Sequence, residues 1–379
     1  MPFSLTEYCQ AARDQRTLFN LEQFLHHRSP QLHSTQARSD ALRYIDSCIQ
    51  QELSALNLSN YPAAAITELE DAIRRMNTLP ENCDVMLGNG IIALLEELLH
   101  AFAKDTSILL PQLDFFLYDI TLEKLAIRPV KFASTQDGHW NLDDAVKKQQ
   151  EHDPAIILLS TPNNPTSRAA PLEFIKTLAS TTNGLLIIDE VYHLFANDPH
   201  AIKSLLQAHD NLVILRSMSK AGYAATGFGY VIGNKEIITC LRQLKGGRAI
   251  PALNVAAGKA LIENHALLEK YIQSCCQWRD HVKSSIAQHT ALTCLPSETD
   301  FLLIKTPEGQ ADALTKRIQE AGIPCISYAP LSPLNNYIRV IPSNIPDAEK
   351  LKLLLELLNA PDETTQPTTK TAEPDLAPR

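Results

Sequence analysis

The chain has 379 residues, of which 45% are hydrophobic and 20% charged, and its formal net charge is −9. This length exceeds what one ordinary hydrophobic core supports, so we expect one large and one small domain. The 43 acidic residues outnumber the 34 basic ones, and the basic residues form no long run. No basic surface is therefore expected to neutralise phosphates, which argues against nucleic acid as a partner.

The sequence also argues against a membrane or a metal as a partner. It contains no stretch of about 18 uninterrupted apolar residues, so no transmembrane helix is expected. Its first residues lack the basic region and the long apolar region of a secretory signal. The eight cysteines include one close pair, Cys275-Cys276, and no CxxC motif. This pattern is typical of reduced thiols, so we expect a cytoplasmic protein without a disulfide framework or a zinc site.

In chain order, residues 1–55 are expected to be helical, with a loop near residues 28–30 and a further helix at Ala63–Met76. Short apolar runs then alternate with amphipathic stretches. The expected strands are Ser107–Leu110, Ile127–Phe132, Ala155–Leu159, Leu185–Ile188, Leu212–Leu215 and Phe228–Ile232. The expected helices are Ile91–Lys104, Phe116–Leu125, Leu142–Gln150, Leu172–Ser180 and Ala201–Leu206. This alternation predicts an α/β fold with a mostly parallel sheet flanked by helices.

The pattern changes after about Ile237, where a long helical stretch includes Ala256–Asn264 and Leu267–Gln288. A smaller α+β domain is expected next, with strands Asp300–Lys305 and Tyr337–Val340 and helices Gly309–Ala321 and Ala348–Leu358. We expect an N-terminal helical segment (1–55) that packs on the small domain, a large domain (56–250), a small domain (251–360) and a tail (361–379). The tail is rich in Thr, Pro and Glu, which predicts disorder.

The motifs with the strongest chemical signal are three strings around Asn164, Asp189 and Lys220. Lys220 ends the run Leu-Arg-Ser-Met-Ser-Lys, which alone is more typical of a surface lysine than of a catalytic one. Asp189 lies 31 residues earlier, where an apolar strand continues into Glu190 and Tyr192, and Asn164 lies 25 residues before Asp189, in Asn-Asn-Pro-Thr. In this order and spacing, the strings resemble the cofactor site of pyridoxal-phosphate enzymes of the aspartate aminotransferase superfamily. The nearest resemblance is to the histidinol-phosphate aminotransferase branch.

The resemblance implies an aspartate aminotransferase-like fold, pyridoxal 5'-phosphate as cofactor, and a role for each matching residue. Lys220 would form the resting Schiff base and act as general base at the substrate Cα. Asp189 would keep the pyridine nitrogen protonated, and Tyr192 and Asn164 would hydrogen-bond the phenolic oxygen. Glu190 is expected to be structural. An Asn before Pro is also typical of a plain turn, which is the alternative for Asn164.

Other positions match the parts of the family site that hold the cofactor phosphate and ring. The resemblance places the phosphate at the glycine turn and helix start made by Gly88, Asn89, Gly90 and Ile91, with Ser217, Ser219 and Thr226 on its other side. Phe115 matches the aromatic residue that stacks on the ring, Tyr118 is a second candidate, and core packing is the alternative for both.

Two further matches concern the substrate and a partner subunit. Arg339 matches the arginine that grips the substrate α-carboxylate through a guanidinium fork. Tyr61 resembles the tyrosine that reaches across a homodimer to the phosphate of the partner site, although a local turn residue is the alternative. The resemblance therefore implies a homodimer that acts on a small amino-acid substrate.

The sequence departs from the family where the phosphates should bind. The family has an arginine a few residues after Lys220, and Thr226 or Gly227 stands in its place here. Arg248 is a candidate for the cation that takes over its role. An Asn-Glu-Asn-Pro segment is absent, and the small-domain arginine that would hold a substrate phosphate is replaced near Ser327. Histidinol phosphate is therefore not the expected substrate.

The sequence is compatible with two reactions. An aminotransferase would form an external aldimine and a Cα carbanion from an L-α-amino acid, and then release a 2-oxo acid. The alternative is an eliminase or cyclase of a hydroxylated, arginine-like amino acid in specialised metabolism. A decarboxylase is disfavoured because Arg339 would protect the carboxylate. A transcription regulator is disfavoured because the residues before Tyr61 are too few and insufficiently basic for a winged helix.

Overall fold

The computed structural model describes residues 39–360, apart from 104–105, 136, 246–249, 330 and 332. The helices expected before residue 39, the tail expected after residue 360 and the candidate Arg248 lie outside the described residues. Within the described ranges, no helix combines the length and apolar character that crossing a bilayer requires.

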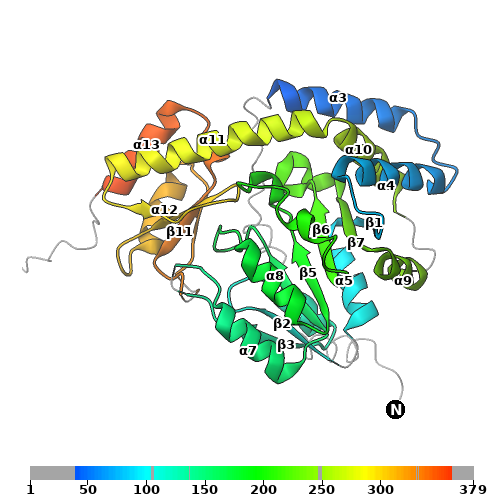
Figure 1. Cartoon of the computed structure of the whole chain (residues 1–379). Helices are drawn as coiled ribbons and strands as arrows, with labels where there is room; N and C mark the ends of the chain where they lie inside the picture. Colours follow the sequence, from blue (N-terminus) through cyan, green and yellow to red (C-terminus); the bar gives the residue numbers. More distant parts are fainter. Residues whose placement is uncertain are drawn as a thin grey trace, which may run out of the picture.

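The centre of the molecule is a seven-stranded sheet in the order β1-β7-β6-β5-β4-β2-β3. Strand β7 is antiparallel to β1 and β6, and the other neighbours that pair with each other are parallel. The mostly parallel α/β sheet predicted from the sequence is therefore confirmed (Figure 1). The strands are β1 (Cys83–Asn89), β2 (Ser107–Pro111), β3 (Arg128–Phe132), β4 (Ile156–Ser160), β5 (Leu185–Asp189), β6 (Leu212–Ser217) and β7 (Phe228–Asn234).

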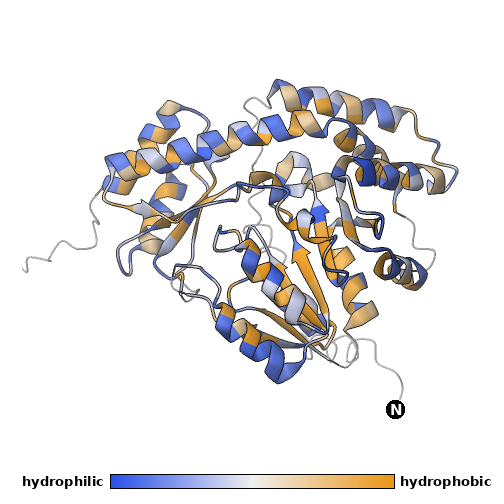
Figure 2. Cartoon of the chain, viewed as in Figure 1, coloured by the Kyte–Doolittle hydropathy of each residue, from blue (hydrophilic) through white to orange (hydrophobic). Residues whose placement is uncertain are grey.

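Helices cover both faces of this sheet because its strands are apolar on both sides. Along β5, Leu186 and Ile188 join the core on one face, and Ile187 joins the core on the other. Figure 2 shows the central strand β5 as hydrophobic along its length, beside helices with one hydrophobic side. The first face carries α4 (Ala63–Asn77), α7 (Leu142–His152), α8 (Leu172–Thr181) and α10 (Ala252–Glu263). The second carries α5 (Gly90–Phe102), α6 (Leu117–Lys124) and α9 (Lys235–Lys245).

A second, antiparallel sheet has the order β10-β11-β9-β8 and forms a smaller α+β unit, as predicted. Its strands are β8 (Thr293–Cys294), β9 (Leu302–Lys305), β10 (Cys325–Ser327) and β11 (Tyr337–Val340), and it packs with α12 (Ala311–Glu320) and α13 (Ala348–Asn359). The long helix α11 (His265–His289) runs along one side of the molecule and contacts both α13 and the N-terminal helix α3 (Asp40–Ser54) (Figure 1).

The structure corrects the sequence-based assignment at four elements. Strands β1, β8 and β10 were not expected, and the helix expected at Ala201–Leu206 is a short 3-10 turn, Ile202–Leu205. Strand β1 contains Asp84, Gly88 and Asn89, which interrupt the apolar pattern of a strand. It is held by pairing along its whole length with β7, and such long-range pairing leaves little local signal.

A buried ion pair ties the central strands to the helix layer. Arg216 on β6 is 1% exposed, and its Nε and Nη2 lie 2.7 Å from Glu190 Oε2. Its Nη1 donates to Asn77 Oδ1 on α4 at 2.8 Å, and Nη2 donates to the Pro199 carbonyl at 3.4 Å. Glu190, expected to be structural, therefore has a structural partner on the next strand.

We expect Arg216→Met to lower the free energy of unfolding by about 3–5 kcal/mol, because it leaves the Glu190 carboxylate buried and unpaired. The double variant R216M/E190M should recover much of that loss, because it removes both charges. Urea unfolding followed by circular dichroism measures both values. A double variant no more stable than the single one would show that the charges are not coupled.

Candidate functional site

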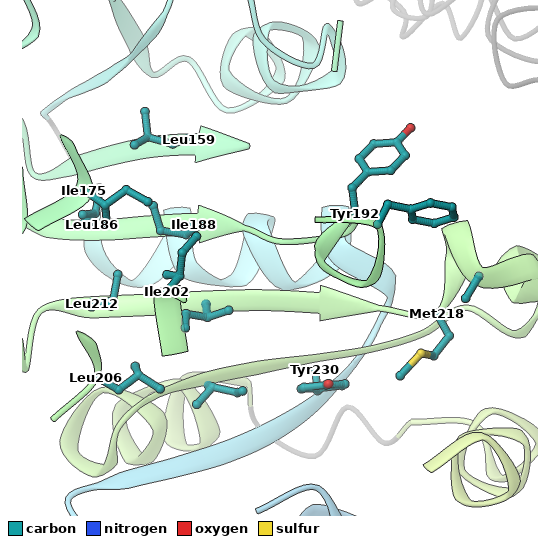
Figure 3. Packing of buried hydrophobic residues seen from close by; sticks show 14 of the residues in the cluster. Leu159, Ile175, Leu186, Ile188, Tyr192, Ile202, Leu206, Leu212, Met218 and Tyr230 are labelled. Carbon is teal, nitrogen blue, oxygen red and sulfur yellow. The ribbon is translucent and has the colours of Figure 1, made fainter. Parts of the chain in front are cut away.

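The expected site residues meet at one edge of the large sheet, where the parallel strands end. Ser160 is paired with Asp189, Ser217 with Gly229, and Gly229 with Gly88. The register therefore aligns the ends of β4, β5, β6 and β1, and ligands bind at this edge of open α/β sheets. The packing that fixes these strands side by side is shown in Figure 3, with Tyr192 just beyond the end of β5.

Lys220 follows β6 in a short π-helical turn, Ser219–Tyr223, in which Gly222 has φ 97°. Its Nζ lies 5.2 Å from the centre of the Tyr192 ring. Tyr192 is 1% exposed, and its hydroxyl has no hydrogen-bond partner among the described residues. Burial raises the pKa of this phenol well above its usual value. A buried hydroxyl without a partner suits a bound group that completes its hydrogen bonding.

Asp189 ends β5 with both carboxylate oxygens already held. Oδ2 accepts a hydrogen bond from the Tyr118 hydroxyl at 2.6 Å, and Oδ1 accepts one from the Val191 N–H at 2.9 Å. Burial raises the pKa of Asp189 to about 6, against the opposing effects of the Tyr118 hydrogen bond, the Val191 hydrogen bond and the Lys220 charge. A cation that approached this carboxylate would lower its pKa again, so the site favours a positively charged ring nitrogen.

Tyr118 was a second candidate for stacking on the cofactor ring, but in the structure its hydroxyl holds Asp189. Its ring is fully buried on the α6 side of the sheet, so it is not available to stack on a ligand. Phe115 is partly exposed and meets Tyr118 edge to face at 5.6 Å, so it remains the candidate stacking residue. The hydrogen bond from Tyr118 to Asp189 was missed in the sequence, which places these residues 71 positions apart.

The two amides of the Asn-Asn-Pro-Thr turn differ in burial and in hydrogen bonding. Asn163 is fully buried; it donates to Asp114 and Ser160 at 3.0 Å and accepts from Thr166. Asn164 is partly exposed and takes no part in that network. Burial, reinforced by the charge of Asp189, raises the pKa of Asp114 to about 7. Asp114 was not singled out in the sequence, and it anchors the segment before Phe115.

The expected phosphate turn is a strand end joined to a helix start. Gly88 and Asn89 close β1, and Gly90 opens α5 with φ 81°. Asn89 makes no side-chain cap on this helix, so the first N–H groups, including that of Ile91, have no side-chain acceptor there. Such a helix start favours an anion.

Of the hydroxyls expected around the phosphate, Ser217 and Ser219 lie together, with 3.0 Å between their oxygens. Thr226 is committed to its own turn, because its hydroxyl donates to the Tyr223 carbonyl at 2.8 Å and accepts from the Phe228 N–H at 3.2 Å. Asn254 on α10, which no sequence signal indicated, donates from Nδ2 to Asn89 Oδ1 at 3.3 Å.

Arg339 approaches the same site from the small sheet. It is 6% exposed, its guanidinium carbon lies 3.9 Å from the centre of the Phe301 ring, and its Nε has no partner among the described residues. Phe301 in turn lies 5.9 Å, ring centre to ring centre, from Tyr192. Although burial acts to lower the pKa of Arg339, the nearby Tyr328, Tyr192 and Asp300 raise it further, so the arginine stays charged.

These observations fit pyridoxal phosphate. The Tyr192 hydroxyl, which has no partner among the described residues, would bind the phenolic oxygen, and the Asp189 carboxylate would bind the ring nitrogen. The start of α5, which has no side-chain cap, would bind the phosphate. Tyr61, expected to act across a dimer, is 85% exposed in the single chain.

Comparisons with known proteins agree with this geometry. Residues 34–357 match the family model for aminotransferase class I and II. A histidinol-phosphate aminotransferase 2 of Nitrosococcus oceani is 27% identical over 274 residues, which cover 72% of this chain and 76% of that protein. A histidinol-phosphate aminotransferase of Polaromonas naphthalenivorans is 30% identical over 68% of this chain and 71% of its own length. The structure of histidinol-phosphate aminotransferase from Sinorhizobium meliloti with pyridoxal-5'-phosphate superposes with a TM-score of 0.73 at 20% identity, covering 91% of this chain and 96% of that one.

The raised pKa of Asp189 predicts a pH-dependent cost to the cofactor-free protein. In the folded state Asp189 keeps its proton up to about pH 6, whereas in the unfolded chain it loses the proton near pH 3.8. The stability of the folded protein therefore falls as the pH rises from 3.8 to about 6, and the loss is constant above about pH 6. Asp189→Asn should therefore stabilise the cofactor-free protein by on the order of 3 kcal/mol at pH 8 and by little at pH 4. Denaturant unfolding at both pH values measures the change in stability. Asp143→Asn, at an exposed position of α7, is the control. An equal effect at both values would contradict the assignment.

Proposed function

Because the chain belongs to the aminotransferase class I and II family, whose model matches residues 34–357, we propose that it transfers the amino group of an L-α-amino acid. It is a pyridoxal-phosphate-dependent transferase. The observation that carries the proposal is the meeting of Lys220, Tyr192 and Asp189 at one strand edge, with Arg339 facing them from the small sheet.

The bound cofactor supplies an electron-withdrawing ring, and the protein decides which substrate bond is broken. The Lys220 amine would hold the cofactor in the resting enzyme and, when free, would move the proton at the substrate Cα. Its place beside the Tyr192 ring, 5.2 Å from the ring centre, keeps it within the site throughout. The Tyr192 and Asn164 side chains would bind the phenolic oxygen.

Asp189 would orient the ring and keep its nitrogen protonated, and Tyr118 holds Asp189 in place through the 2.6 Å hydrogen bond. Phe115 would cover one ring face. Arg339 binds the substrate α-carboxylate through its guanidinium, whose Nε is without a partner in the described chain. A carboxylate held in this way is protected from loss, so the Cα proton is the group that leaves.

The substrate side chain is proposed to be neutral or cationic rather than phosphorylated. Ser327 lies on β10, whose residue Ile326 pairs with Arg339, and its Oγ accepts a hydrogen bond from the Ala329 N–H at 3.1 Å. Ile326, which shares the face of Arg339, is apolar, whereas Ser327 pairs with Ile338 on the opposite face. No guanidinium therefore stands on β10 beside the carboxylate site. The curated relatives are named as histidinol-phosphate aminotransferases, and we propose that this chain differs from them in this feature.

A second proposal concerns assembly as a homodimer in which Tyr61 reaches the cofactor phosphate of the partner site. Tyr61 is 85% exposed, and Leu58, Leu253 and Phe116 are further exposed apolar side chains. Phe116 adjoins Phe115, and Leu253 adjoins Asn254, which bonds to Asn89. A site that lacks the usual arginine at Thr226 depends more heavily on each remaining phosphate contact.

Lys220→Ala should lower turnover by at least about 10³-fold, since it removes both the holding amine and the base. The matched control is Lys147→Ala at an exposed position of α7, which should leave turnover unchanged.

A screen against an amino-acid panel without keto acid, read by cofactor absorbance and mass spectrometry, tests the reaction itself. One equivalent of 2-oxo acid supports transamination. Repeated turnover would instead support elimination or cyclisation, with hydroxylated arginines included in the panel for that outcome.

Tyr61→Phe should weaken retention of the cofactor by about tenfold, because one charge-assisted hydrogen bond to the phosphate is lost. Tyr44→Phe, at another exposed tyrosine (57% exposed), is the control and should retain the cofactor normally. Equilibrium dialysis followed by cofactor absorbance gives both values. Equal retention in the two variants would remove Tyr61 from the site.

A further inference from the structure

A cavity lies beside Phe195, apart from the residues of the candidate cofactor site. Its volume is about 230 Å³, and it is bordered by α11, by the start of the small sheet and by the turn Pro342–Asn344. Phe195 lines it and meets Tyr192 at 6.3 Å between ring centres, so the two sites share one aromatic wall. None of the residues given a role in the reaction lines this cavity.

The cavity is lined by one buried acid and one buried base. Asp300 is 8% exposed, and its carboxylate accepts no hydrogen bond and pairs with no cation in the described part of the chain. Its Oδ1 is fully enclosed and without a partner. A carboxylate in this state is costly and rare unless a ligand completes it.

Arg279 on α11 supplies the positive charge and is 4% exposed. Its Nε donates to Asp280 at 3.0 Å, and its Nη1 donates to the carbonyls of Phe195 and Thr299 at 3.4 and 3.0 Å. Within the described residues, Nη2 donates to no acceptor. Arg279 and Asp300 do not form an ion pair with each other, so each keeps its charge available to a third group.

The remaining walls are apolar or weakly polar. Trp278, Phe195, Pro342 and Pro346 provide apolar surface, and the Ser343 hydroxyl has no partner among the described residues. The volume lies below the range of about 300–1,000 Å³ that is typical of drug-sized ligands. The occupant must therefore be small, must carry both charges and must present an apolar group.

We propose that this cavity binds a second, non-reacting amino acid as a zwitterion. Asp300 receives its ammonium, Nη2 of Arg279 receives its carboxylate, and its apolar side chain packs against Trp278 and Phe195. This site goes beyond the proposed reaction, because it needs neither the cofactor nor Lys220. It is linked to the reaction through the Tyr192–Phe195–Phe301 aromatic wall and through the charge of Asp300, which also acts on Arg339.

Tryptophan fluorescence can test this directly, because the chain has two tryptophans and only Trp278 lines the cavity. Trp140 packs against Phe132 and Phe174 instead. In a Trp140→Phe holoenzyme, titration with L-leucine should give a saturable change in Trp278 emission. Isopentylamine and 4-methylpentanoate, which each lack one of the two charges, should bind at least about tenfold more weakly.

Three variants complete the test. Asp300→Asn and Arg279→Gln should each weaken leucine binding by at least about tenfold. Ser274→Phe, at an exposed α11 position on the cavity rim, should block it while both charges remain. The absence of a saturable change, or equal binding of leucine and 4-methylpentanoate, would overturn the proposal. A fluorescence change that persists in Ser274→Phe and parallels a change in the visible absorbance of the cofactor would also overturn the proposal. Leucine would then be bound at the cofactor site. A failed transamination assay leaves this readout unaffected.

Discussion

The two-residue alternation of β5 and β6 is the constraint on which the rest of the site depends. Because side chains alternate between the faces, Asp189 points to the side of α6, where Tyr118 donates to it. Glu190, the next residue, points to the opposite side, where Arg216 pairs with it. One strand end thus carries a residue of the candidate site on one face and a buried ion pair on the other. A slip of one residue would exchange the two carboxylates and disable both functions.

The candidate site contains several buried polar groups that have no partner within the described chain. The Tyr192 hydroxyl and Arg339 Nε lack partners in the described chain, and Asp189 and Asp114 have raised pKa values because both are buried. These features lower the stability of the empty protein. A cofactor or substrate that satisfies them binds only the folded chain and therefore stabilises it. The same arrangement that costs stability when empty gives the site its affinity when occupied.

Much of this architecture was predictable from local sequence. The apolar runs at β2 to β7 and the spacing of Asn164, Asp189 and Lys220 gave the large sheet and its ligand edge, because each signal is local or repeats along the chain. The errors fell where structure comes from distant partners. Strand β1 exists through β7, the role of Tyr118 depends on a residue 71 positions away, and Asn254 meets Asn89 across 165 positions. No pattern within a single sequence encodes such pairings.

The hydrogen bond between Tyr118 and Asp189 also has an evolutionary consequence. Position 118 can change only to a residue that donates a proton at the same distance, since otherwise one oxygen of a buried carboxylate is left without its donor. Position 189 must in turn keep an acceptor for as long as Tyr118 is present. The two sites are thus expected to vary together in a lineage, while Phe115, three residues before Tyr118, is free to drift among flat side chains. Altered reactions would then arise by changes around this pair and not within it.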